Sequence, residues 1–416
     1  MRNSPFWWIL VGFMILLDTY FFQVVKSLTQ HAQPRTKTLI YASYWIISIG
    51  AILLLFLLPL LSSDKQTRFA RSTIFALIAG LFFAKLIASL FFLIDDIRRG
   101  VQWIVAKLGS GRKEETGAEA ITRSAFLSWA GMFAGGTLFT TLVHGFSNKY
   151  KYQVRRVALN LPNLPAGFKG MKVVQLSDIH CGSFDNKSAV IKGVERIMAE
   201  KPDMVLFTGD LVNNSADEMD EFIDVFNKIK APLGVYSVLG NHDYGDYMQW
   251  DSDELKKANL ARLKAIHGEL GWKLLMNEHV AIERQGEKIA LLGIENWSAK
   301  AGFPKYGDLT RAYAGSENYP FRILMSHDPS HWKAEVCEKF PGIDLCLAGH
   351  THGMQFGVEV PGLKWSPVQY MYREWAGLYE KPGDPRQQLY VNRGFGFIGY
   401  PGRVGILPEI TVFTFG

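Results

Sequence analysis

Five short polar blocks carry the residues of this chain that could do chemistry. Each block ends an apolar run rich in β-branched residues, at 171–176, 204–208, 235–239, 323–325 and 343–348. Such runs are typical of buried parallel strands, whose carboxyl ends are where open α/β sheets hold ligands. The blocks are Ser177-Asp178-Ile179-His180, Gly209-Asp210, Gly240-Asn241-His242-Asp243, Ser326-His327-Asp328 and Gly349-His350-Thr351-His352.

The residue types in these blocks indicate a hydrolytic site with two divalent metal ions. Carboxylate, imidazole and amide ligands suit Mn, Fe, Zn or Co, and a carboxylate that touches two ions bridges them at about 3.5 to 4 Å. In Asp178-x-His180 and His350-x-His352 the ligands are two residues apart, so an extended segment presents both on one face. We expect Asp210 to be the bridging carboxylate.

Each block alone is a weak signal. A Gly-Asp or Ser-His-Asp at a strand end is a simple turn about nine times in ten. The blocks that hold Asn241 and His350 are harder to explain as turns, because clustered histidines bring no packing advantage. All five blocks in this order, each after a strand, favour the metal site.

At these residues the chain resembles the calcineurin-like metallophosphoesterase superfamily, whose pattern runs D-x-H, G-D, G-N-H-[DE], a lone H and then G-H-x-H. The match covers residues 172–415. Within the superfamily it is most similar to membrane-tethered bacterial phosphoesterases related to a UDP-diacylglucosamine pyrophosphatase. That narrower resemblance rests on the first and last blocks and on the segment 390–396 with the following 408–410. Met354 departs from it, because that branch usually has a second glycine before the glutamine that is here Gln355.

The resemblance implies two ligand sets that share one carboxylate. One metal would be held by Asp178, His180, Asp210 and His352, and the second by Asp210, Asn241, His327 and His350. It leaves His242 free of the metals and beside the scissile phosphate, where it would stabilise charge and protonate the leaving oxygen. A hydroxide between the metals would attack phosphorus in line.

Other polar residues have weaker claims on the site. Arg393 and Arg403 are candidates for phosphate binding, with a solvated or structural role as the favoured alternative. Five histidines outside the blocks are interpreted as surface or interfacial residues: His31, His144, His267, His279 and His331. A helix beginning at Pro329 would lean His331 toward the pocket.

The N-terminal third is predicted to cross a membrane four times, at 6–25, 40–61, 73–94 and 125–143. About 20 apolar residues suffice to cross a hydrocarbon core of about 30 Å. Spans one and three contain Asp18 and Lys85, which we predict to pair inside the bundle, with snorkelling of Asp18 as the alternative. Residues 101–108 are expected to form a short separate helix at the interface.

Four spans place the N-terminus and the region after the fourth span on one side of the membrane. The longest loop between spans carries six basic residues, and the following span resembles an export signal. We therefore predict that this loop is cytoplasmic and that the catalytic domain lies outside the cytoplasm of a bacterial plasma membrane. The basic residues are Arg98, Arg99, Lys107, Arg112, Lys113 and Arg123.

The predicted organisation is a multi-pass transmembrane region at 1–147, a linker at 148–170 and a metallophosphoesterase domain at 171–416. Helical periodicity is found at 189–198, 218–229 and 255–270, and 280–294 is typical of a β-hairpin. Alternating strands and helices followed by antiparallel pieces predict a two-sheet α/β sandwich, in agreement with the four layers (α/β/β/α) of the family's fold. The formal charge of +6 is explained by basic residues beside the spans, so we expect a lipid bilayer and no nucleic acid as partner.

Two functions from different classes fit this sequence. The first is a membrane-anchored binuclear-metal phosphohydrolase that cleaves a phosphodiester, pyrophosphate or phosphomonoester bond, with lipid-linked phosphates among its candidate substrates. The alternative is a membrane scaffold or sensor whose domain binds a ligand with little turnover. The intact ligand set favours the hydrolase, since a degenerate domain is expected to have lost some of these residues.

Overall fold

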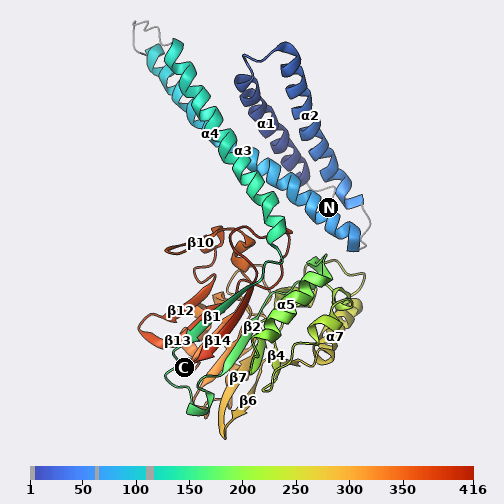
Figure 1. The fold of residues 1–416 in the computed structure, drawn as a ribbon, viewed down its shortest axis with the longest axis vertical. Helices are drawn as coiled ribbons and strands as arrows, with labels where there is room; N and C mark the ends of the chain where they lie inside the picture. The colour runs from blue at the N-terminus through green and yellow to red at the C-terminus, as the bar shows by residue number, and fades with distance from the viewer. Residues whose placement is uncertain (1–4, 61–64, 109–116) are drawn as a thin grey trace. The chain divides into compact units, whose positions relative to one another are not determined.

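The computed structural model describes residues 5–60, 65–108 and 117–416, and the chain divides into two compact units, Met1–His144 and Gly145–Gly416. The first unit is helical and the second combines helices with two large sheets (Figure 1). Leu61, Arg112 and Lys113, which enter the expectations for the spans and their loops, lie outside the described residues.

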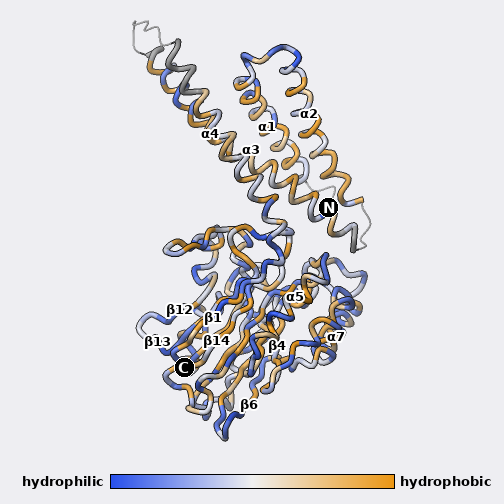
Figure 2. Tube along the Cα trace, in the orientation of Figure 1, coloured by the Kyte–Doolittle hydropathy of each residue, from blue (hydrophilic) through white to orange (hydrophobic). Residues whose placement is uncertain are grey.

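Four long apolar helices form the first unit, as the sequence predicts. Each contains a stretch long and apolar enough to cross a membrane, and apolar residues cover most of their length (Figure 2). The prediction of a separate helix at 101–108 is wrong, because the third helix continues through Gly100 to Leu108. A single helical glycine costs only about 1 kcal/mol relative to alanine, which a long helix absorbs. The helices are α1 (Pro5–Leu28), α2 (Pro34–Leu57), α3 (Lys65–Leu108) and α4 (Gly117–Gly145).

Asp18 and Lys85 form the predicted ion pair inside this bundle. Lys85 Nζ lies 2.6 Å from Asp18 Oδ1 and donates to Ser48 Oγ at 2.7 Å. Tyr44 and Ser48 donate to the same carboxylate oxygen at 3.0 Å each. Asp18, Ser48 and Lys85 are buried. The cluster thus joins α1, α2 and α3 through side-chain contacts.

The second unit is built on two six-stranded sheets. The first has the order β1-β14-β2-β3-β4-β5 and the second β12-β13-β9-β8-β7-β6. The first contains β1 (Gln153–Leu159), β2 (Lys172–Leu176), β3 (Met204–Phe207), β4 (Val235–Ser237), β5 (Lys273–Leu274) and β14 (Glu409–Phe415). The second contains β6 (Glu278–Arg284), β7 (Glu287–Gly293), β8 (Arg322–Met325), β9 (Leu345–Ala348), β12 (Gly377–Lys381) and β13 (Asp384–Val391).

Successive side chains along each strand face opposite sides of the sheet, so they pack into three separate hydrophobic cores. Val173 of β2 packs between the sheets with Leu291 of β7, whereas the adjacent Val174 faces the helices beside the first sheet. A third core lies on the outer face of the second sheet, where Leu324 meets Trp332. The covering helices are α5 (Lys187–Ala199), α6 (Ile223–Phe226) and α7 (Asp253–Glu269) on the first sheet, and α8 (Leu309–Tyr313), the π-helical η7 (Trp332–Val336) and α9 (Cys337–Lys339) on the second. These layers confirm the α/β/β/α sandwich.

Three local expectations differ from the structure. The predicted helix at 218–229 is limited to α6, which follows the 3-10 turn η5 (Ala216–Met219). The predicted linker at 148–170 contains β1, which pairs in parallel with β14 and so belongs to the first sheet. A small hairpin of β10 (Val358–Val360) and β11 (Leu363–Trp365) stands outside both sheets and was not expected. The hairpin predicted at 280–294 is confirmed as β6 and β7.

Candidate metal centre

The five polar blocks follow the carboxyl ends of β2, β3, β4, β8 and β9. Parallel pairing joins β2 to β3, β3 to β4 and β8 to β9, so the loops after these strands lie along the same edge of their sheets. The two edges, one from each sheet, meet at the site, because the backbone N–H of His350, after β9, donates to the carboxylate of Asp178, after β2, at 3.0 Å. The topology therefore gathers residues that are up to 174 positions apart, from Asp178 to His352.

Six of the predicted metal ligands fall into two groups of three. Within each group the potential ligand atoms lie within 4.8 Å of one another. In the first group, His352 Nε2 lies 3.2 Å from Asp178 Oδ1 and 3.0 Å from His180 Nε2. The groups are Asp178, His180 and His352, and Asp210, His327 and His350.

Asp210 lies between the two groups. Its Oδ2 is 3.1 Å from His327 Nε2 and 3.5 Å from His180 Nε2, so one oxygen faces a histidine of each group. Its Oδ1 accepts the backbone N–H of His242 at 2.8 Å, which fixes the carboxylate plane. This is the position that a carboxylate bridging two cations requires.

The nitrogen atoms of the site have the pattern expected of metal ligands. His327 Nδ1 donates to the Thr208 carbonyl at 2.7 Å, which turns Nε2 toward the Asp210 carboxylate. His180 Nε2 and His352 Nε2 face each other at 3.0 Å, and His327 Nε2 faces Asp210 Oδ2 at 3.1 Å. A divalent cation between the carboxylates and imidazoles would accept lone pairs from several such nitrogen atoms at once.

The electrostatics of the site favour an added positive charge. Burial alone would raise the pKa of Asp210, but the histidines around it hold that pKa well below its usual value. Burial alone would lower the pKa of His327, but Asp210 and other neighbours raise it to about 10. Burial keeps the pKa of His180 well below its usual value, so this imidazole is a neutral ligand. The carboxylates thus attract a cation, which can be a proton or a metal ion.

His350 is oriented by two residues that sequence reasoning did not assign. Its Nδ1 lies 2.8 Å from Asn241 Oδ1, the amide predicted as a ligand in the same set. Its Nε2 lies 2.9 Å from the Tyr372 hydroxyl and 3.5 Å from Asp328 Oδ2. Metal-bound histidines commonly hold their second nitrogen against a carboxylate or hydroxyl in this manner. Asp328 was within a predicted block, but nothing in the sequence places Tyr372 here.

The backbone at the site is strained in a way that points the ligands inward. Ten non-glycine residues of the described chain have positive φ, and five of them are predicted ligands. Such conformations cost of order 1 to 3 kcal/mol each and concentrate at functional sites. The five are Asp178 (φ 53°), His180 (φ 48°), Asp210 (φ 61°), His350 (φ 69°) and His352 (φ 50°).

Two glycines leave room for the carboxylates. A Cβ at Gly240 would collide with the Asp210 carboxylate, and one at Gly349 would collide with Ser177 and Asp178. Asp243 fixes the same loops, because it accepts the backbone N–H groups of Gly240, Asp210, Leu211 and Val212 at 2.8, 2.9, 2.8 and 3.3 Å. These contacts explain why the Gly-Asn-His-Asp block needs both its first and its last residue.

His242 belongs to neither group of ligands among the residues that the structure describes. Its Nδ1 donates to the Asn213 carbonyl at 2.8 Å, and its ring lies edge to face with His180 at 5.0 Å between centroids. The imidazole is half-buried and stacks beside Tyr247, at 4.6 Å between ring centroids. The Asn213 contact leaves Nε2 as the atom that can exchange a proton.

Comparison with known proteins agrees with both halves of the chain. Residues 171–354 match the family model "Calcineurin-like phosphoesterase", and residues 1–149 match the model "Probable Calcineurin-like phosphoesterase, transmembrane domain". A metallophosphoesterase of Bacillus subtilis, named YkuE and described as uncharacterized, is 31% identical over 256 residues, which cover 60% of this chain and 81% of that protein. The chain belongs to the calcineurin-like phosphoesterase family.

Two further relatives show different parts of this organisation. A second uncharacterized metallophosphoesterase of Bacillus subtilis, YkoQ, is 29% identical over 253 residues, covering 60% of this chain and 84% of that protein. The "Transmembrane protein with metallophosphoesterase domain" of Danio rerio is 29% identical over 263 residues, covering 61% of this chain. The match spans 55% of the length of the Danio rerio protein. This chain is thus a multi-pass membrane member of the family.

Arg393 and Arg403 have structural contacts. Arg393 is buried and pairs with Glu409 at 2.5 Å and Glu359 at 2.7 Å. Arg403 is fully buried, donates to the Arg393 carbonyl at 2.8 Å and lies 3.3 Å from Nδ1 of His352. Both guanidinium groups are therefore committed inside the domain, which favours the structural alternative over direct phosphate binding.

Two histidines outside the blocks are not at the surface, contrary to expectation. His267 of α7 is fully buried, bonds to Ser237 Oγ at 2.9 Å through Nδ1, and has its pKa lowered to about 3 by burial. His331 is also fully buried, between Ser326 Oγ and Glu335 Oε2 at 2.9 Å each. Both are core residues with polar partners, so the interpretation as surface histidines is wrong for them.

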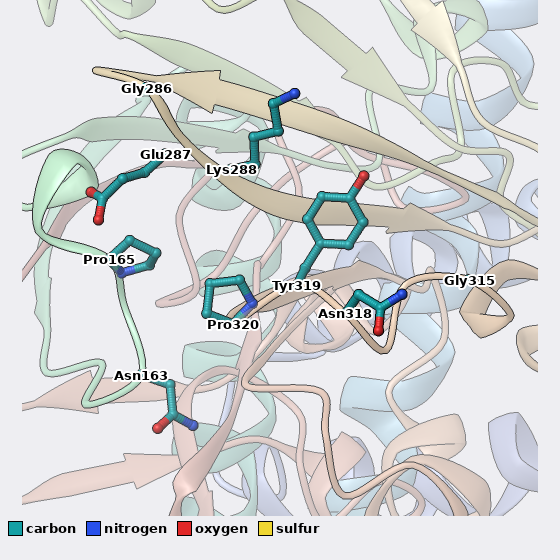
Figure 3. Close-up of a pocket in the computed structure, with 9 residues that line it drawn as sticks. All are labelled: Asn163, Pro165, Gly286, Glu287, Lys288, Gly315, Asn318, Tyr319 and Pro320. Carbon is teal, nitrogen blue, oxygen red and sulfur yellow. The ribbon is translucent and has the colours of Figure 1, made fainter.

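Figure 3 shows a cavity of about 700 Å³, and none of the candidate metal ligands lines it. It is lined by residues that precede or begin strands, including Glu287 at the start of β7 and Pro320 before β8. The metal ligands follow the opposite ends of the parallel strands. This cavity is therefore separate from the candidate metal centre.

Proposed function

We propose that this protein is a metal-dependent phosphohydrolase that cleaves a phosphodiester, pyrophosphate or phosphomonoester bond. The observation that carries the proposal is the pair of ligand groups that meet at Asp210 Oδ2. The proposed ligands are the two sets implied by the family: Asp178, His180, Asp210 and His352 for one ion, and Asp210, Asn241, His327 and His350 for the other. In this proposal 1–147 is the anchor and 171–416 is the catalytic domain, with β1 of the intervening segment completing its sheet.

Two divalent cations, when bound there, supply Lewis acidity that polarises the phosphoryl oxygens and lowers the pKa of an attacking water. The protein supplies their placement. Asp243 holds the loop of Asp210, and Tyr372 with Asp328 orients His350. Positive φ at five ligands keeps the donor atoms convergent before any substrate arrives. Such prearranged charge is usually the largest contribution to catalysis.

His242 is the proposed proton donor. With Nδ1–H held by the Asn213 carbonyl, its protonated form carries the second proton on Nε2. The carbonyl stabilises that imidazolium through a charge-assisted hydrogen bond. Transfer of the Nε2 proton to the leaving oxygen neutralises the alkoxide or phosphate that departs, and the histidine returns to its neutral tautomer. A positioned general acid of this kind contributes about 10² to 10⁴ in rate.

The proposal includes lipid-linked phosphates as substrates. It is supported by the multi-pass anchor and by aromatic residues near the ligands, since Phe303 lies 4.9 Å from the ring of His350 and Tyr247 lies 4.6 Å from that of His242. The alternative, a scaffold or sensor that binds a ligand without turnover, is separated by a direct assay.

The test is metal analysis and hydrolysis on one preparation. We expect the purified full chain to contain about two divalent ions and to hydrolyse bis-(p-nitrophenyl) phosphate. Lipid-linked and soluble phosphates are then compared in detergent micelles. A protein with both ions bound but no turnover on any of these esters would contradict the hydrolase and favour the sensor.

A further inference from the structure

The hairpin of β10 and β11 has its polarity reversed relative to ordinary surface hairpins. Val358 pairs with Trp365 and Val360 with Leu363, so these four side chains share one face, and Glu359 and Lys364 share the other. The face of Glu359 is turned to the domain, where Glu359 pairs with Arg155 at 2.6 Å and Arg393 at 2.7 Å. Lys364 also reaches back, with Nζ bound to the Ala376 carbonyl.

The apolar face of the hairpin is exposed. Val358 is 42% exposed, Val360 53% and Leu363 53%. The apolar side chains of these short strands face water, whereas the polar side chains form ion pairs with the domain. The hairpin therefore gains no stability from its apolar side chains unless another surface covers them, which indicates a covered surface in the working protein. We name Val358, Val360 and Leu363 the hairpin face.

Further exposed apolar residues adjoin the hairpin face. The turn η9 (Pro367–Tyr370) follows β11 and packs on η8 (His352–Gln355), since Ser366 Oγ donates to the Gly353 carbonyl at 2.9 Å. Tyr370 is 78% exposed, Met371 58% and Met354 46%. Beneath these turns a small core fixes their shape, formed by Val368, Tyr372, Trp375, Ala376 and Ile406. The exposed apolar surface therefore belongs to an ordered substructure.

This substructure is tied to the end of the fourth membrane span. That span runs to Asn148, and its last residues belong to the second unit. The Gly145 carbonyl accepts the N–H of Arg403 at 2.9 Å, and Asn148 Nδ2 donates to the Arg403 carbonyl at 3.1 Å. Val404, the next residue, bonds to the backbone of Gln355 and Gly357 at 2.8 and 2.9 Å. Gly357 immediately precedes β10.

These contacts limit the distance between the hairpin and the bilayer. Two backbone hydrogen-bonded steps and two steps along the chain separate Gly145 from Val358, which amounts to no more than roughly 20 Å between Cα atoms. The covering partner must therefore be present at the membrane surface. A bilayer interface is always there, it accepts aliphatic side chains, and it is where tyrosine is enriched in membrane proteins.

We propose that the hairpin face, together with Tyr370 and Met371, inserts into the headgroup region of the bilayer that holds the four spans. The hairpin then forms a second point of attachment for the catalytic unit. Because η8 carries His352 at its start and Met354 at its exposed side, this attachment brings the edge of the candidate metal centre toward the lipid headgroups. The proposal concerns where the surface lies and does not depend on catalytic activity.

The test measures the environment of single labelled positions in the full chain reconstituted into lipid nanodiscs. Cys181 and Cys346 are buried, so Cys337→Ser leaves no other accessible thiol among the described residues. In that background, Leu363→Cys and Tyr370→Cys are labelled with an environment-sensitive NBD fluorophore. Leu255→Cys on α7 is the matched control, because Leu255 is an equally exposed leucine, at 51%, of the same unit.

We expect the labels at 363 and 370 to emit at shorter wavelength than the label at 255 and to be quenched about twofold more by lipids with a doxyl group near the headgroup. Two positions keep the test valid if one variant misfolds, which circular dichroism of each labelled protein detects. A water-like emission at both positions overturns the proposal. So does a blue-shifted emission without lipid quenching, which would show that protein, either a second copy of this chain or its own helices, covers the face.

Discussion

Two buried polar clusters of this molecule differ in where their positive charge comes from. In the membrane unit, Asp18 has its cation in the chain itself, since Lys85 lies 2.6 Å from its Oδ1, and Ser48 and Tyr44 donate to the same oxygen. In the second unit, Asp178 Oδ1 lies 3.2 Å from His352 Nε2 and Asp210 Oδ2 lies 3.1 Å from His327 Nε2, so imidazoles stand where the first cluster has a lysine. The first cluster has its cation in the chain, whereas we propose that metal ions supply the positive charge of the second. This difference distinguishes a structural ion pair from a ligand-binding site, although both consist of buried charged side chains.

The largest effect is expected from removing the carboxylate charge of Asp210, which lies between the two candidate ligand groups. Asp210→Asn leaves the shape of the side chain but removes the negative charge between the two groups. We expect the metal content of the purified protein to fall together with complete loss of ester hydrolysis, as measured by elemental analysis and a p-nitrophenyl assay on the same sample. Asp224→Asn, at an exposed surface position of α6, is the matched control and should change neither.

Retention of both ions in the Asp210→Asn protein would show that Asp210 is not the bridge. A fall in metal content with normal turnover would show that the ions are not required. Either result would remove the distinction between the two clusters.

A second prediction separates proton transfer from metal binding. His242→Ala removes an imidazole that belongs to neither ligand group, so about two metal ions should remain while turnover falls about 10² to 10⁴-fold. The loss should be smaller for p-nitrophenyl esters, whose leaving group departs without a proton, than for alkyl esters. The measurement is kcat on a series of leaving groups with metal content determined in parallel. Equal losses across the series, or a protein without metal, would assign His242 a different role.

The contact between Tyr372 and His350 offers a finer change to the same cluster. Tyr372→Phe removes one hydroxyl that lies 2.9 Å from His350 Nε2, and leaves the ring in its small core. Loss of such an orienting contact typically weakens metal affinity about 10 to 100-fold. Competition with a chelator should show this weakening, and excess metal should restore activity. Tyr379→Phe is the control, because it removes a hydroxyl of β12 that bonds to the backbone of Trp375 and Ala376 instead of to a histidine. Unchanged affinity would mean that the hydroxyl does not orient the histidine.

In the membrane unit, the stability losses caused by replacing Asp18 and Lys85 should not be additive. Asp18→Asn or Lys85→Met each leaves an uncompensated charge in the bundle and should lower the midpoint of thermal unfolding in detergent. The double variant should be more stable than the sum of the two losses by about 1 to 3 kcal/mol. Additive losses would show that the two residues do not interact. Metal content should not change in any of the three proteins, which contrasts this cluster with the catalytic one.

His267 is a third kind of buried titratable group, one that is neutral at physiological pH because burial lowers its pKa. Its pKa is about 3 in the folded protein because of burial, and about 6.5 in an unfolded chain. Between these values the unfolded state binds more protons, so this group lowers the free energy of unfolding as pH falls below 6.5, by about 2 kcal/mol at pH 5. His267→Gln keeps a polar partner for Ser237 without titrating. The variant should lose less stability than the parent between pH 7.5 and pH 5, and an equal loss would contradict a neutral buried histidine.

The sequence predicts those features that depend on local patterns. The strand ends, the two-residue spacing of Asp178 and His180, and the apolar length of the spans each follow from short stretches of chain. It predicts the Asp18 and Lys85 pair as well, because an unpaired charge inside a membrane is costly wherever the partner lies in sequence. These are cases in which one physical requirement allows few solutions.

Features that depend on contacts between distant residues were missed. Tyr372 orients His350 across the fold, and no spacing rule connects them. His267 has the pattern of an ordinary helical residue, and only the packing of α7 on the first sheet shows that it is buried. The prediction of a separate helix at 101–108 was wrong for the opposite reason. The glycine at position 100 is a local signal for a helix end, but its cost is small compared with the stability of a long helix.

The parallel pairing of β1 with β14 has a consequence for biosynthesis. Gln153, only a few residues beyond the last membrane helix, lies opposite Glu409, and β14 is the strand that separates β1 from β2. The first sheet therefore cannot close until residues 409–415 have been synthesised, long after the spans have entered the membrane. Until then β1 and β2 offer unpaired edges, to which a chaperone or a neighbouring nascent chain can bind. We expect the rate-limiting step of maturation to be the insertion of this late strand, with premature termination before residue 409 producing a chain that is inserted in the membrane but recognised and degraded as unfolded.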